Sequence, residues 1–148
     1  MLLCVINHFS TKLLTTKTMN RLQLIEAFAT TAAAKNYPFA TLAAEGVPTA
    51  ADSLPKLLLE PPVFVAIEGR SAGKITYSVK LHLLLSGTNL PPANRHNVED
   101  IAEAEMLDLL MQLSNNQSVI FVDEVRIGPS AIGSTVGCTA TAKVVTEF

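Results

Sequence analysis

The chain has 148 residues, of which 49% are hydrophobic and 16% are charged, and its formal net charge is −2. That length suits a single domain with a substantial core. The slightly negative charge and the scattered Lys and Arg residues argue against a nucleic-acid-binding protein, which normally carries a basic stripe. Two cysteines, Cys4 and Cys138, are too few for a disulfide scaffold and are expected to be buried free thiols.

The charged fraction lies well below the quarter that is usual for globular domains. Two interpretations fit such an apolar chain. Part of its surface is buried against other subunits, or a well-packed small domain is covered by Ser, Thr and Asn.

Residues 1–18 precede the first periodic segment of the chain. Their apolar run, Leu2 to Ile6, is five residues long, too short for a signal-peptide core or a membrane span. No other window is long enough to predict a membrane segment. We expect the folded domain to begin at Met19, and residues 1–18 to be a flexible extension or a wrongly assigned start.

The spacing of apolar residues predicts a helix over residues 20–35, with Asn20 as its N-cap. Pro38 ends the helix, because the residue before a proline avoids the helical region. The predicted buried stripe is Leu22, Ile25, Phe28, Ala29 and Ala32.

Residues 37–62 contain Pro38, Pro48, Pro55, Pro61 and Pro62 among Leu, Ala and Val. Prolines at this density argue against a long regular element, although the segment is too apolar for disorder. We expect an ordered irregular loop, with a short helical turn possible within residues 50–59. Loops of this length are uncommon and usually functional, and the simplest function here is contact with a neighbouring subunit.

A hairpin is predicted next. The segment VFVAIE (63–68) is followed by the glycine-bounded turn GRSAG and by KITYSVKLHLLLSG (74–87). Residues 75–85 alternate between apolar and polar with the period of a half-buried strand. The second strand is about twice as long as the first, so its far half must pair with another element.

A second helix is predicted over residues 98–113, after a loop at residues 88–96, with Asn97 as its N-cap. Its buried stripe is expected to be Val98, Ala102, Met106, Leu109, Leu110 and Leu113.

The chain is predicted to close with strands at 118–127 and 134–145, joined by the turn GPSAIGS. The apolar run in SVIFVDEV indicates burial on both faces and a central place in the sheet, with Asp123 and Glu124 where the strand reaches water. These elements predict an α+β fold, with an antiparallel sheet of about four strands in two hairpins and two helices packed on one face. Residues 19–148 are expected to form one domain.

Two stretches suggest nucleotide hydrolysis, but neither meets the requirements of the motif it resembles. In EGRSAGK (68–74), Glu68 stands where a phosphate-binding loop requires glycine, and Ile75 replaces the Ser or Thr that touches magnesium. A strand also follows instead of the required helix. Asp123 and Glu124 cannot form a paired carboxylate site, because neighbours on a strand point to opposite faces.

The remaining chemical groups give weak signals. His8, His82 and His96 have no metal-like spacing. A Cys138–His82 pair stays open, although a small buried thiol is the simpler interpretation. The acidic residues Glu99, Asp100, Glu103, Glu105 and Asp108 suggest a solvated helix face, a divalent metal site or a surface facing a basic patch on a partner. On balance, we predict no catalytic residue, no cofactor and no metal site.

The order of elements from Met19 to Phe148 is helix, irregular loop, long hairpin, second helix and closing hairpin. This order resembles the tail-terminator and related neck or tail-completion proteins of long-tailed bacteriophages. The resemblance implies a non-enzymatic virion structural protein, assembled in the host cytoplasm. Its copies would form a ring, commonly a hexamer, at the head–tail joint and contact other tail or connector proteins.

The expected oligomer interface comprises the irregular loop and two turns. The residues concerned are Leu42, Val47 and Leu54 in the loop, Gly69 and Arg70 in the first turn, and Pro129 and Ile132 in the second. Two alternatives stay open. One is a small ligand-binding domain or enzyme with a pocket between the sheet and residues 37–62, near Tyr37, His82 and Cys138. The other is an adaptor that binds one other protein through the same loop.

Overall fold

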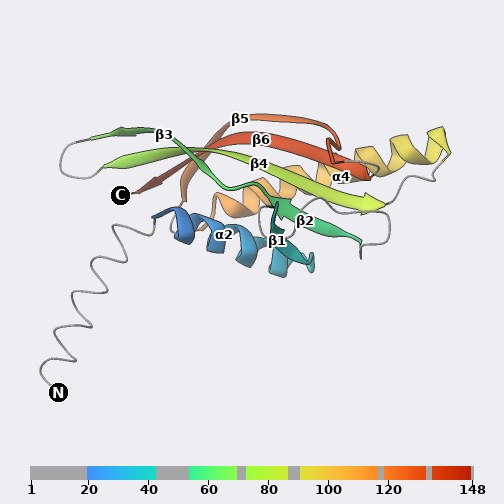
Figure 1. The fold of residues 1–148 in the computed structure, drawn as a ribbon, viewed down its shortest axis with the longest axis horizontal. Coiled ribbons are helices and arrows are strands. Elements are labelled where there is room, and N and C mark those ends of the chain that lie inside the picture. Colours follow the sequence, from blue (N-terminus) through green and yellow to red (C-terminus); the bar gives the residue numbers. More distant parts are fainter. Residues whose placement is uncertain are drawn as a thin grey trace, which may run out of the picture.

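A computed structural model describes residues 20–42, 54–69, 73–86, 91–116, 119–132 and 135–147. Residues 1–18, and with them the predicted extension, lie outside this part of the chain. The described elements, in chain order, are α2 (Asn20–Ala34), β1 (Phe39–Thr41), β2 (Lys56–Leu59), β3 (Val63–Glu68), β4 (Lys74–Ser86), α4 (Pro92–Leu113), β5 (Val119–Pro129) and β6 (Val136–Glu147). The predicted α+β class is confirmed (Figure 1).

The sheet has six strands in the described residues, not the four predicted. Its order is β1-β2-β4-β6-β5, with β3 also paired to β4. All pairs are antiparallel except β1–β2. The two hairpins, β3–β4 and β5–β6, occur as predicted.

The two additional strands come from the segment predicted to be irregular. Pro55 and Pro61 flank β2 without interrupting it, and residues 56–59 are extended instead of helical. β2 pairs with Leu81–Leu84, while β3 pairs with Lys74–Ser78. The expectation that the far half of the long strand needs another partner is therefore confirmed.

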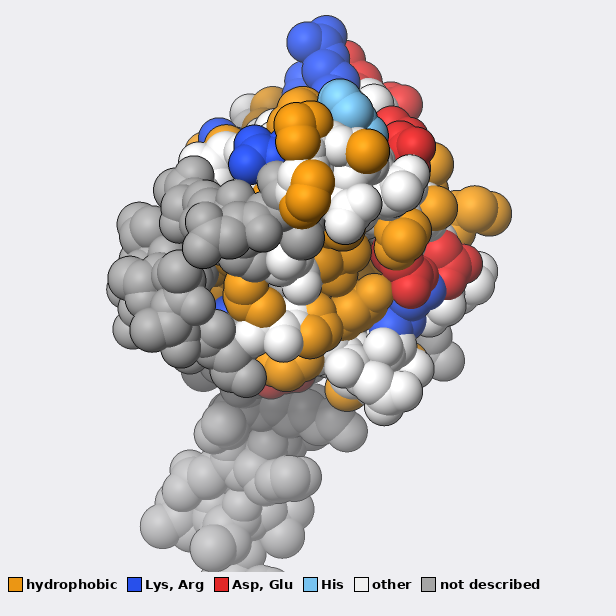
Figure 2. All heavy atoms as spheres, turned by 90° about the vertical axis from the view of Figure 1, so that its right-hand side faces the viewer, with side chains coloured by type: hydrophobic (Ala, Val, Ile, Leu, Met, Phe, Trp, Pro, Cys, Tyr) orange, Lys and Arg blue, Asp and Glu red, His pale blue; other side chains and the backbone are white. Residues whose placement is uncertain are grey.

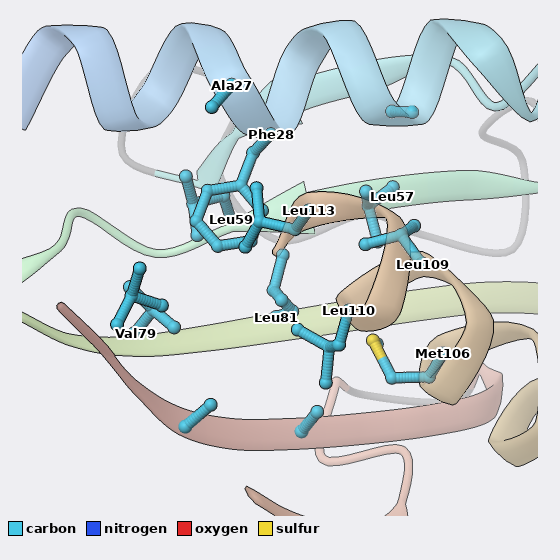
Figure 3. Packing of buried hydrophobic residues seen from close by; sticks show 14 of the residues in the cluster. Ala27, Phe28, Leu57, Leu59, Val79, Leu81, Met106, Leu109, Leu110 and Leu113 are labelled. Atoms are coloured by element: carbon cyan, nitrogen blue, oxygen red, sulfur yellow. The ribbon is translucent and has the colours of Figure 1, made fainter. Parts of the chain in front are cut away.

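The core lies between the sheet and the two helices. Alternate residues of β4, from Ile75 to Leu83, and of β6, from Cys138 to Val144, belong to one buried cluster with α2 and α4. Phe28 reaches from α2 towards Leu59 and Leu113 (Figure 3). The helices divide the sheet between them: α4 packs on β4, β5 and β6, whereas α2 contacts β1, β2 and α4. The predicted four-strand sheet did not anticipate this division.

Helix α2 lies where it was predicted, but its buried face is rotated. Leu24 and Ala27 are buried with Phe28 and Ala32, whereas Leu22 is 46% exposed. The side-chain amide of Asn20 donates a hydrogen bond to Thr146 Oγ1 at 2.6 Å. Asn20 therefore ties the start of α2 to β6.

Helix α4 begins at Pro92, earlier than the predicted Val98, and the expected N-cap Asn97 lies inside it. Proline suits the first helical position, because that residue needs no backbone N–H partner. The predicted loop before the helix is therefore wrong in its second half. Five of the six predicted stripe residues are buried: Ala102, Met106, Leu109, Leu110 and Leu113.

Strand β5 is an edge strand, and the prediction of a central strand buried on both faces is wrong. It pairs with β6, and most of its residues, including Ile120, Phe121 and Val125, are exposed. The register shifts between Asp123 and Arg126, and Glu124 has a φ of 50°. Asp123 and Glu124 thus mark a β-bulge within an exposed edge strand.

The pairing of β4 with β6 includes one very close approach. A Cβ atom added to Gly137 would lie 1.9 Å from the carbonyl oxygen of Leu83, a distance that no side chain tolerates. A Cβ atom added to Gly128 on β5 would meet nothing within 4 Å. The two glycines therefore form a matched pair, one packed tightly and one in open space.

We expect Gly137→Ala to lower the free energy of unfolding by about 3 kcal/mol, because β4 and β6 must separate to accept the methyl group. Gly128→Ala should change it by less than about 0.5 kcal/mol. Chemical denaturation of both variants measures the difference. Equal stability of the two variants would contradict the register between β4 and β6.

Candidate functional site

The structure separates Cys138 from His82. Cys138 faces α4, and its thiol donates a hydrogen bond to the carbonyl oxygen of Ala102 at 3.3 Å. His82 pairs in register with Thr139, the next residue along β6, and so lies on the other face of the sheet. The two residues form no catalytic pair, which resolves the alternative left open by the sequence.

His82 is fully buried and both of its ring nitrogens are occupied. Nε2 lies 2.7 Å from Glu60 Oε2, and Nδ1 lies 2.9 Å from Thr139 Oγ1. Thr139 Oγ1 also accepts a hydrogen bond from the backbone N–H of Ala131 at 2.9 Å. Glu60, His82 and Thr139 are bonded in the same order as the acid, histidine and hydroxyl of a hydrolase triad. Both ring nitrogens of His82 are bonded within the protein, however, and the arrangement anchors Glu60 to the sheet.

The alternation predicted for residues 75–85 puts His82 on the polar face of its strand, and it gives no sign of Glu60 as a partner. Leu81, Leu83 and Leu84 surround His82 in the sequence. Such an apolar setting is the signal that this histidine is buried and needs hydrogen-bond partners.

Cys138 is held as an unreactive thiol. Burial, with a smaller contribution from the nearby Glu103 carboxylate, raises its pKa to about 12. It lines a cavity of about 170 Å³ beside Glu99, Asp100 and Glu103 of α4 and Gly128 of β5. Because the thiolate is the nucleophilic form, this cysteine is poorly suited to catalysis.

Cys138 should resist alkylation in the folded protein at pH 8 and react rapidly once the protein is denatured. Treatment with iodoacetamide followed by peptide mass spectrometry measures the two rates. Fast labelling of Cys138 in the native state would contradict its burial and its raised pKa.

Two of the five predicted acidic residues of α4 attach this helix to α2. Lys35 Nζ lies 2.7 Å from Glu105 Oε2 and also contacts Asp108. Hydrogen bonds to Asp108 and Glu105 raise the pKa of Lys35, and the hydrogen bond from Lys35 lowers the pKa of each carboxyl group. The Tyr37 hydroxyl adds a hydrogen bond to Glu105 Oε1 at 3.1 Å.

Metal binding finds no support among the described residues. In that part of the chain no group of three or more His, Cys, Asp or Glu side chains is arranged to hold a metal ion. Glu124 instead pairs with Lys143 at 2.8 Å, and it shares a shallow polar hollow with Arg126 on the face of the sheet opposite the helices.

The structure brings together three of the predicted interface residues. Leu42, Leu54 and Ile132 form a small cluster with Leu58 and Leu84. Ile132 is buried there, whereas Leu42 and Leu54 are partly exposed. Hydrophobic and acidic side chains both reach the surface at the end of the molecule seen in Figure 2.

The other predicted interface residues lie elsewhere. Gly69 is exposed after β3 with a φ of 102°, and Pro129 is exposed at the end of β5. Val47 and Arg70 lie outside the described residues.

Two exposed apolar surfaces were missed by the sequence analysis. On β3, the side chains of Val63, Phe64, Val65 and Ile67 are between 44% and 61% exposed. At the opposite edge of the sheet, α4 and β5 form a groove of about 170 Å³, which is lined by Leu107, Leu110, Met111, Ser114, Val122 and Val125. The signal for β3 was its run of consecutive apolar residues, which places apolar groups on both faces of the strand.

No protein-family model matches the chain, and no curated protein matches it. Neither helix of the described part combines the length and apolar character needed to cross a bilayer.

Proposed function

We propose that this protein is a non-enzymatic virion structural protein, similar to the tail-terminator and neck proteins of long-tailed bacteriophages. Its copies form a ring at the head–tail joint, with other tail or connector proteins as neighbours. The observation that carries the proposal is the pair of exposed apolar surfaces on opposite edges of one sheet, β3 on one side and the α4–β5 groove on the other.

Opposite surfaces suit a ring better than a two-fold dimer. When two different surfaces of a subunit contact each other head to tail, the chain of copies always keeps one free surface of each kind at its ends. Copies therefore continue to add until the rotation between neighbours closes the chain into a ring. Exposed apolar patches rimmed by polar residues are typical of protein interaction sites. The low charged fraction of the chain, 16%, agrees with a surface that is partly covered by neighbours.

The chemical groups of the described residues favour a structural role over catalysis. His82 and Cys138 are the catalytic candidates that the sequence left open, and each is engaged by protein partners. Catalytic groups need access to substrate and a pKa near the working pH. Cys138 meets neither condition, and His82 is buried with both nitrogens bonded.

The protein at micromolar concentration should have the mass of a closed oligomer, with six copies as the size common in the resembled family. Native mass spectrometry and light scattering measure the mass, and negative-stain electron microscopy shows the ring. Because the contact is mainly apolar, the oligomer should persist at high salt. A monomer at both low and high salt would contradict the proposal.

The virion assignment has an independent test. Genes for portal, capsid and tail-tube proteins should lie beside the gene for this chain. A neighbourhood of metabolic genes would argue against the virion while leaving the oligomer to its own measurement.

A further inference from the structure

We infer that β3 of one copy docks on the β5 edge and the α4–β5 groove of the next copy, so that the sheet continues from subunit to subunit. The inference rests on the proposed ring and names its contact. The partner is a second copy of this chain. The donor strand is Val63–Glu68, and the acceptor is β5 together with the groove lined by Leu107, Met111, Val122 and Val125.

The donor strand has a free edge and exposed apolar side chains. It pairs with β4 along one side, and in the described part of the chain no strand pairs with its other side. All six of its residues are exposed. Phe64 packs edge-on against Tyr77 at a centroid distance of 6.4 Å, which holds the strand on β4. An exposed apolar edge strand of this kind is a template for another strand.

The acceptor combines a strand edge with a hydrophobic groove. β5 pairs with β6, and its opposite side has no strand partner among the described residues. Beside it, Leu107 is 48% exposed and Met111 is 71% exposed on α4. Met is flexible and adapts to an incoming apolar side chain. Apolar side chains of a docked strand would pack against the apolar residues that line this groove.

The strand directions make this contact repeatable. β3 runs antiparallel to β4, β4 to β6, and β6 to β5, so the two edge strands β3 and β5 run in opposite directions. A second copy placed alongside in the same orientation therefore presents its β5 antiparallel to β3, with its helices on the same side. Antiparallel pairing is the more stable kind, and the twist of the sheet supplies a rotation at each step.

The size of the surfaces indicates that the groove takes part. A stable interface buries about 800 Å² on each partner. Four half-exposed apolar side chains on a short strand supply roughly a few hundred Å². Contact with Leu107 and Met111 on α4 is therefore needed in addition to the strand edge.

The test uses two full-length variants that each lose one surface. Val63→Glu with Ile67→Glu removes the donor, and Leu107→Glu with Met111→Glu removes the acceptor. All four positions are exposed, so the fold should survive, which circular dichroism and thermal unfolding check. Leu22→Glu on α2, also an exposed apolar position, is the matched control and should assemble like the wild type.

Each double variant alone should be monomeric, and an equimolar mixture should give a dimer with one copy of each and no larger species. Native mass spectrometry distinguishes these states, because the variants differ in mass. Rings formed by either variant alone would overturn the assigned surfaces while the ring itself stands. A mixture that stays monomeric would overturn the head-to-tail contact.

A wild-type monomer would instead refute the proposed function itself, and this contact with it. Should a Glu variant fail to fold, Val63→Thr with Ile67→Thr and Leu107→Gln with Met111→Gln give the same comparison. Weaker assembly of each alone, by at least tenfold in dissociation constant, would support the contact, and unchanged assembly would overturn it.

Discussion

The antiparallel pairing of β4 with β6 runs from Lys74↔Glu147 to Ser86↔Val136, and most other elements attach directly to it. β2 and β3 share the free side of β4 end to end, β5 takes the free side of β6, and α4 packs on the face of both central strands. The close approach at Gly137 shows how tightly the register is set. Because β4 is long, β3 can pair with one end of it, and β3 lies there without cover from either helix.

Most of the side chains that could take part in chemistry stabilise this architecture instead. His82 anchors Glu60, Cys138 bonds the backbone of α4, and Lys35 joins the two helices through Glu105 and Asp108. The features without an intramolecular purpose are apolar and exposed: β3 on one side and the α4–β5 groove on the other. This distribution is the physical basis for proposing an assembly subunit instead of an enzyme.

The sequence predicted well the elements whose burial is decided by one face. The alternation of β4 from Ile75 to Leu81 and five of the six stripe residues of α4 match the buried residues, since each of these faces has one environment. It could not predict β2, because that strand exists through a non-local pairing with β4. Nor could it place β5: an apolar run such as Val119–Val122 shows that both faces need cover, but not whether the cover lies within the subunit. For the candidate site, the bonding of His82 depends on Glu60, which lies far away in sequence and was not predictable from the pattern.

Hydrogen exchange of the wild-type protein tests the central claim most directly. Amides of Val63–Glu68 and Val119–Pro129 should exchange more slowly at concentrations where the oligomer forms than after dilution to the monomer, because the two edges pair with each other between copies. Amides of α2 should change little. An oligomer that forms while both edge strands keep their monomeric exchange rates would contradict assembly through the sheet edges.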